Sequence, residues 1–167
     1  MVFFSPVSTP VPVSEDEILA VCEAALRLAP SEWLPDLQVS NKLLGTPEWY
    51  SFEHDAWPLG ESIRRAFLRY PRLKKRTSLI SKIVDVATCR NLRHGRQSFI
   101  MALGFVAASQ FAPKLVPFLD DSDVDGQVVY TLLKMRSPGY ADAVAPLTQS
   151  NKAWIRRLAK RYMERYG

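Results

Sequence analysis

The sequence predicts an all-α fold, a short solenoid of stacked helix pairs with helices that cap its N-terminal end. Through most of the 167 residues, apolar side chains recur three and four positions apart, which is the period of an α-helix. No segment shows the two-residue alternation of a strand. A proline-containing segment, a polar turn and a longer apolar stripe occur twice, and residues 116–119 match residues 145–148 after a shift of 29 positions. Because a helix pair cannot bury both of its helices alone, repeated pairs are expected to share one continuous core.

The N-terminal part is predicted as a tail followed by a helix. Residues 1–13 hold three prolines among Ser and Thr, which favours extended backbone over a packed element. Ser14 and Glu17 have the spacing of a capping box, and Ile18 and Cys22 begin a helical stripe that ends at Pro30. The tail is therefore expected to precede a single helical domain over residues 14–167.

Residues 30–60 show no clear period, because prolines and a glycine divide them into short pieces. We expect short helices in loops here, with a regular helix only from residue 60 to residue 70. Five aromatic side chains in this region are predicted to cover the open end of the solenoid core rather than to bind a ligand, and residues 14–72 together form the predicted cap. These aromatic residues are Trp33, Trp49, Tyr50, Phe52 and Trp57.

Residues 76–167 are predicted to form three helix pairs. The first pair has a stripe that starts at residue 77 or 78 and ends near residue 91, then a stripe from Phe99 to Val106. The second consists of residues 113–119, an Asp-rich turn and a stripe from Val124 to Met135. The third consists of residues 141–147, a polar turn and a stripe from Ile155 to Tyr166.

This region resembles HEAT-type helical repeats. Residues 115–119 form a short segment with an internal proline before an Asp-containing turn, and residues 153–159 resemble the isoleucine, arginine and later alanine of the family's second helices. Gln127 and Val128 stand where the family usually has an arginine. The resemblance implies a protein-binding scaffold, and small stand-alone bacterial proteins of this type resemble immunity proteins of toxin systems. One branch resembles DNA glycosylases that hold duplex DNA on a basic concave surface.

The charge is unevenly distributed. Residues 1–60 hold 2 basic and 9 acidic residues, whereas residues 61–116 hold 12 basic and 2 acidic residues, a net charge of +10. Such a pattern indicates electrostatic docking of a macromolecule, either protein or nucleic acid. The two cysteines form no Cys-x-x-Cys pair, and the longest uncharged run, residues 97–113, is too polar to span a bilayer. We therefore expect a cytoplasmic protein without membrane association.

No catalytic motif is present. The chain has two histidines and lacks the common metalloprotease, phosphate-binding, esterase and dinucleotide-binding motifs. The sequence Glu53-His54-Asp55 is interpreted as a solvated loop, and Cys22 and Cys89 as buried and inert thiols. The sequence thus predicts no enzyme, no cofactor and no small-molecule substrate.

Asp121, Asp123, Asp125 and Gly126 match the first half of a calcium loop. The bidentate glutamate of such a loop is replaced by Leu132, so no metal site is predicted. We expect the Asp turn to cap the following helix, and it also offers an acidic surface to a basic partner.

Helical phase predicts a ridge of polar, aromatic and basic side chains over the three second helices. Arginine, tyrosine and tryptophan are the residues that carry most binding energy at protein interfaces. The ridge therefore predicts a protein-binding surface, and the resemblance implies a bacterial immunity protein that binds and neutralises a toxin domain. The alternative is a nucleic-acid-binding protein that resembles DNA alkylation-repair proteins. A structural adaptor is the third possibility. The predicted partner-binding residues are Arg93, Arg96, Gln97, Asp123, Asp125, Gln127, Tyr130, Lys134, Trp154, Arg157 and Arg161.

Overall fold

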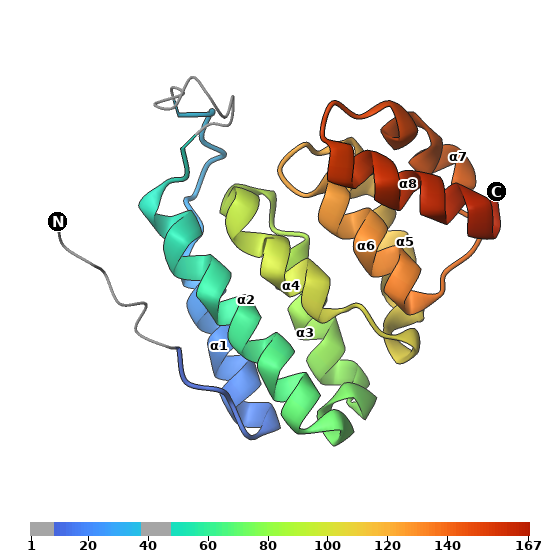
Figure 1. The fold of residues 1–167 in the computed structure, drawn as a ribbon. Helices are drawn as coiled ribbons and strands as arrows, with labels where there is room; N and C mark the ends of the chain where they lie inside the picture. The colour runs from blue at the N-terminus through green and yellow to red at the C-terminus, as the bar shows by residue number, and fades with distance from the viewer. Residues whose placement is uncertain (1–8, 38–47) are drawn as a thin grey trace, which may run out of the picture.

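A computed structural model describes residues 9–37 and 48–167, and within these ranges the regular structure is helical, with no strand (Figure 1). The all-α prediction is confirmed for the described residues. Most of the predicted tail, residues 1–8, lies outside them. Residues 9–13 have no regular structure, and the Arg65 guanidinium donates a 2.9 Å hydrogen bond to the Thr9 carbonyl.

The first helix, α1 (Glu15–Leu28), begins as the capping box predicts. The Ser14 hydroxyl accepts a 3.2 Å hydrogen bond from the Glu17 backbone N–H, and the Glu17 carboxylate accepts one of 2.7 Å from Val13. These bonds satisfy backbone donors that a helix start leaves without an internal partner. Ile18 and Cys22 are fully buried on the predicted face.

Helix α2 (Ser51–Arg69) corrects the prediction for residues 30–60. Instead of short helices in loops, the chain is helical from residue 51 and continues through Pro58. The Glu53 carboxylate accepts a 2.6 Å hydrogen bond from the Tyr50 N–H and so stabilises the helix start. Pro58 suggested a helix end because its ring blocks one internal hydrogen bond, but packing of the buried Ala56 and Ile63 outweighs that loss. Residues 38–47 of this region lie outside the described residues.

The first predicted pair corresponds to α3 (Thr77–Ala87) and α4 (Gln97–Ala102). Two 3₁₀ segments, η1 (Pro71–Lys75) and η2 (Arg90–Arg96), precede these helices. The second stripe is shorter than predicted, because Val106 lies beyond the helix in η3 (Val106–Phe111) and is exposed.

The C-terminal part repeats one order of elements. A short helix, α5 (Ala112–Leu115), leads into η4 (Val116–Asp120) and then α6 (Asp125–Met135). The same order returns as α7 (Ala141–Val144), η5 (Ala145–Gln149) and α8 (Ala153–Tyr166). Each 3₁₀ segment contains the proline that defined the 29-residue shift. The predicted stripes of α6 and α8 are largely confirmed, since their buried members include Val128, Leu132, Ile155, Ala159 and Tyr162.

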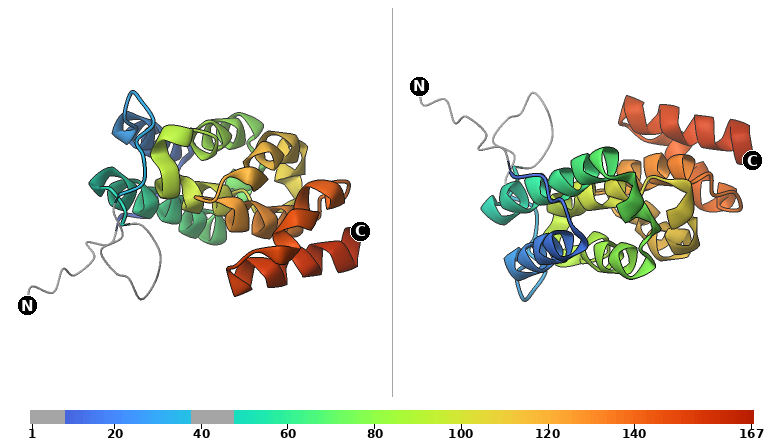
Figure 2. Two further views of the ribbon diagram at one scale, coloured as in Figure 1. Left: turned by 90° about the horizontal axis from the view of Figure 1, so that it is seen from above. Right: turned by 90° about the horizontal axis from the view of Figure 1, so that it is seen from below.

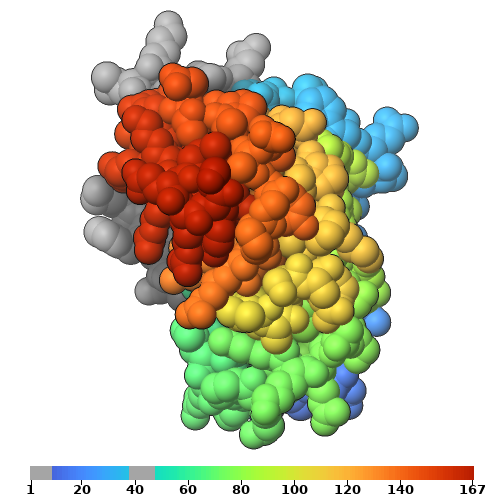
Figure 3. All heavy atoms as spheres, turned by 90° about the vertical axis from the view of Figure 1, so that its right-hand side faces the viewer, coloured from blue at the N-terminus to red at the C-terminus, as the bar shows by residue number. Residues whose placement is uncertain are grey.

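The helices pack in two rows. Helix α1 contacts α3 on one side, while on the other α2 contacts α4, α4 contacts α6, and α6 contacts α8. The views along the helices show α1, α3 and α5 on one side and α2, α4 and α6 on the other, with the core between them (Figure 2). From the side, the residues of α7 and α8 gather at one end of the molecule, above residues of the middle of the chain (Figure 3). Among the described residues, no helix has the length and apolar character needed to cross a bilayer.

Two glycines permit close helix contacts. A Cβ atom on Gly60 of α2 would lie 2.2 Å from the Ser98 hydroxyl and 2.7 Å from the Phe99 backbone nitrogen. A Cβ atom on Gly126 of α6 would lie 2.1 Å from the Trp154 ring. The α2–α4 and α6–α8 contacts therefore require residues without side chains at these positions.

Candidate functional site

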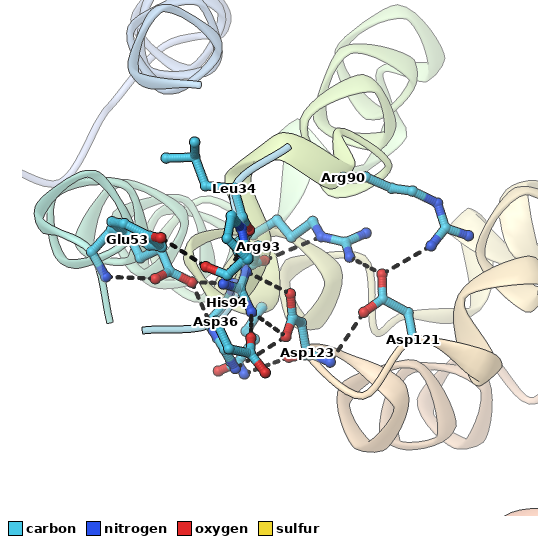
Figure 4. A network of polar contacts seen from close by, with 12 residues as sticks. Leu34, Asp36, Glu53, Arg90, Arg93, His94, Asp121 and Asp123 are labelled. Atoms are coloured by element: carbon cyan, nitrogen blue, oxygen red, sulfur yellow. Dashed lines mark hydrogen bonds and ion pairs between the residues drawn. The ribbon is translucent and has the colours of Figure 1, made fainter. Parts of the chain in front are cut away.

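One candidate site is a cluster of charged side chains where α2, η2 and the turn before α6 meet (Figure 4). It joins residues from four separate parts of the sequence through hydrogen bonds and ion pairs. We call it the polar cluster, and its members are Asp36, Glu53, Arg90, Arg93, His94, Arg96, Asp121 and Asp123.

Glu53 and His94 form the centre of the polar cluster. The Glu53 carboxylate is fully buried and accepts hydrogen bonds from the His94 backbone N–H at 2.9 Å and from its ring Nδ1 at 2.7 Å. The second ring nitrogen, Nε2, lies 3.3 Å from an Asp123 carboxylate oxygen. Burial alone would raise the pKa of Glu53, but the bonds from His94 and Tyr50 outweigh it and hold that pKa below its ordinary value. Both ring nitrogens of His94 thus face carboxylates, and the Trp49 ring stacks on the imidazole at 5.2 Å.

Arg93 connects the polar cluster to the segment before residue 38. Its backbone has φ 51° and ψ −129°, a conformation that residues other than glycine rarely adopt. The guanidinium donates two 3.2 Å bonds to Asp123, one of 3.3 Å to the Leu34 carbonyl and a further bond to Asp36. Burial lowers the pKa of this guanidinium, but the two carboxylates more than compensate, so the pKa is raised. These bonds offset the cost of an unusual backbone conformation.

Arg96 is the more deeply buried arginine, with no exposed surface. It donates to the Asp121 carboxylate and to the Arg93 carbonyl, and its guanidinium lies 4.9 Å from the centre of the Phe118 ring. Burial lowers the pKa of Arg96 more than the Asp121 carboxylate raises it, so this pKa lies below the ordinary arginine value. Arg96 and Asp121 therefore link η2 to the turn before α6 inside the protein.

The predicted ridge is wrong at Arg93 and Arg96, because both arginines are buried within the polar cluster. Arg93 is 2% exposed and Arg96 is 0% exposed, so neither side chain forms the exposed surface that the sequence analysis predicts. Gln97 donates a 2.7 Å hydrogen bond to the Asp123 carbonyl, and Asp123 is itself buried. Helical phase does not predict the direction of this side chain, because Arg93 lies in a 3₁₀ segment and has a positive φ itself, so the segment is not a regular helix.

The Asp turn also has a role different from the predicted cap. The residue before α6 is Val124, and no side chain caps that helix. Asp121 and Asp123 pair with arginines instead, and Asp121 accepts a 3.1 Å bond from the Asp123 N–H. Asp125 is half-buried and bonds the Gly126 N–H at 2.7 Å, and burial raises its pKa. No group of three or more His, Cys, Asp and Glu among the described residues has the arrangement of a metal site.

Sequence reasoning missed Glu53 and His94. It placed Glu53 in a solvated loop, whereas the residue is buried in the first turn of α2. One signal was available, because an acidic residue at the third position of a helix frequently bonds the backbone at the helix start. The pairing with His94, 41 positions away, depends on how α2 packs against η2.

A second candidate site is an open surface over α2, α4, α6 and α8. It has two hollows, of about 190 Å³ between α2 and α6 and of about 340 Å³ between α6 and α8. Tyr130 and Lys134 border both of them. We call this the basic surface, and its cationic residues are Arg64, Lys74, Lys134, Arg136, Arg161 and Arg165.

The basic surface brings together part of the predicted ridge. Tyr130 and Lys134 of α6 border the same hollow as Arg161 of α8, as the helical phases predict. Arg157 is exposed on α8 but does not border either hollow. Trp154 is 40% exposed, and its ring lies over Gly126, so it connects α8 to α6. Gln127 is half-buried on α6, one turn before Tyr130.

The two thiols differ in burial. Cys22 has no exposed surface, and burial raises its pKa to about 12. Cys89 is half-buried, so the prediction that both thiols are buried holds fully only for Cys22.

No family model, curated protein or solved structure matches this chain.

Proposed function

We propose that this protein is a non-enzymatic, protein-binding module of the HEAT-like class that acts by stoichiometric binding of a partner. The observation that carries the proposal is the basic surface, where Tyr130 and Lys134 lie between two open hollows beside further arginines. Tyrosine and arginine around an open hollow are the composition of energetic anchors at protein interfaces.

The packing of the helices supports the HEAT-like part of the proposal. Elements of the same order recur in the C-terminal half, and α2, α4, α6 and α8 contact one another in turn along one row. The bonds of Arg93 to Asp123 and of Arg96 to Asp121 run from one helix pair to the turn of the next. Such bonds hold neighbouring repeats in register, so a solenoid of stacked pairs accounts for the buried arginines.

The polar cluster supports a structural rather than a catalytic use of its histidine. Both nitrogens of His94 face carboxylates, so neither ring nitrogen has a free position for proton exchange with a substrate. The Glu53 carboxylate is likewise fully buried. The function we propose therefore depends on the open basic surface.

We further propose, as the resemblance implies, that the partner is a toxin domain whose active site or substrate surface this protein covers. The test is co-expression with the product of the adjacent coding sequence, followed by size-exclusion chromatography and a growth assay. The proposal expects a one-to-one complex and restored growth. A folded neighbouring product that neither binds nor inhibits growth would contradict it.

Nucleic-acid binding is the second candidate function. It is favoured by one observation, that no carboxylate of the described residues borders either hollow of the basic surface. Binding to phosphates releases counterions and weakens steeply with salt, whereas binding to a folded protein depends less on salt. Electrophoretic shifts with duplex DNA and tRNA at two salt concentrations distinguish these two functions.

A further inference from the structure

Most charges of the basic surface have no oppositely charged partner among the described residues. Lys134, Arg136 and Arg161 form no ion pair with any described residue, in contrast to Arg90, Arg93 and Arg96 of the polar cluster. Within the part of the chain that the structure describes, Arg64 alone among the cations of this surface has a carboxylate partner, Glu61, at 2.7 Å. The like charges around these hollows repel one another, so an anionic occupant would be attracted to them.

Apolar side chains line part of both hollows of the basic surface. The smaller hollow is bordered by Leu68, which is 77% exposed, and by Phe67 and Met101. The larger hollow is bordered by Leu133 and Leu158. The charged sugar-phosphate backbone of a nucleic acid covers such surface poorly, whereas a polypeptide with leucine or phenylalanine side chains buries it.

Two cations of the basic surface lie over aromatic rings. The Lys134 ammonium lies 5.6 Å from the centre of the Tyr130 ring, and the Lys74 ammonium lies 5.3 Å from the centre of the Phe105 ring. One face of each ring is thus in contact with a cation. The ammonium groups are held where an acidic side chain that enters the hollow could meet them.

We propose that the basic surface binds an acidic segment of a partner protein, in which carboxylates alternate with apolar side chains. Its carboxylates pair with Lys134, Arg136 and Arg161, and its apolar side chains enter the two hollows on either side of Tyr130. The segment lies across α4, α6 and α8. This inference rests on the proposed protein-binding function and names the chemistry of the partner.

The test uses synthetic probes and a charge-reversal variant. The probes are a peptide of repeated Glu-Glu-Leu units, poly-L-glutamate and duplex DNA, and binding is followed by fluorescence anisotropy and by NMR shifts of the protein. The variant is Lys134→Glu with Arg161→Glu. The matched control is Lys114→Glu with Lys160→Glu, which changes the charge equally at two exposed positions outside both hollows.

The inference predicts that the Glu-Glu-Leu peptide binds more tightly than poly-L-glutamate and that the variant loses about tenfold or more in affinity for it. The control should lose much less, and NMR shifts should gather at residues 130–136 and 158–165. Tighter binding of duplex DNA through the same pair of residues would overturn the inference in favour of nucleic acid. Equal losses in variant and control, or no peptide binding, would overturn it as well.

Binding of the co-expressed partner to the same charge-reversal variant separates the inference from the proposed function. If the co-expressed partner still forms a one-to-one complex with the Lys134→Glu and Arg161→Glu variant at unchanged affinity, the acidic-segment inference fails and the protein-binding function stands. If no protein binds and DNA binds, both fail.

Discussion

Substitution Glu53→Gln tests the polar cluster. The carboxylate is fully buried and accepts three hydrogen bonds, at 2.6, 2.7 and 2.9 Å, from the Tyr50 N–H, the His94 ring and the His94 N–H. Glutamine has nearly the same shape but replaces one accepting oxygen with an NH₂ group, which would point at a donor. Hydrogen bonds to a charged group contribute about 1.5–3 kcal/mol, so we expect the free energy of unfolding to fall by about that amount at neutral pH.

The loss of stability caused by Glu53→Gln should depend on pH. The pKa of Glu53 in the folded protein lies below the ordinary 4.5, so its ionised form stabilises the fold. That stabilisation is fully present above 4.5 and is lost as the pH falls through the lower folded pKa. The difference between the wild type and Glu53→Gln should therefore shrink at acidic pH.

Urea unfolding followed by circular dichroism at several pH values measures both effects. Glu23→Gln is the matched control, because Glu23 is exposed on α1, and it should unfold nearly as the wild type does. A Glu53→Gln protein as stable as the wild type at neutral pH, or a difference that grows on acidification, would refute the role given to this carboxylate.

Three further predictions concern packing, thiol chemistry and binding. Gly60→Val should lower the free energy of unfolding by about 1–3 kcal/mol, because the added Cβ meets the Phe99 backbone nitrogen at 2.7 Å, and an unchanged melting temperature would contradict this. In the folded protein Cys22 should not react with a thiol reagent at mildly alkaline pH, since it is buried and its pKa is raised to about 12, and rapid native labelling of Cys22 found by mass spectrometry would exclude this. Tyr130→Ala and Arg161→Ala should each weaken partner binding by about 1–3 kcal/mol in a titration while thermal melting stays unchanged, and unchanged binding would remove that residue from the interface.

Most of the helices could be predicted from the sequence because their apolar stripes are regular. The stripes of α1, α3, α6 and α8 coincide with buried residues, and the recurring proline segments identify η4 and η5. The start of α2 was missed because Pro58 and the nearby aromatics resemble a loop, although tertiary packing keeps the chain helical there.

The polar cluster could not be predicted from local patterns. Arg93 and Arg96 resemble an exposed basic face in the sequence, and only the packing of η2 against the turn before α6 shows that Asp121 and Asp123 neutralise them inside the protein. A positive φ at a residue other than glycine also has no clear signal in one sequence. Tyr130, Lys134 and Arg161 were found together because they lie on regular helices whose phase follows from spacing.

Hydrogen exchange on the complex with the product of the adjacent coding sequence tests the central claim most directly, because it locates the bound surface without any substitution. If the basic surface binds the partner, amides at residues 130–135 of α6 and 158–165 of α8 become protected, while those of α1 and α3 keep their free rates. Protection confined to α1, α3 or the polar cluster, with α6 and α8 unchanged, would contradict the claim.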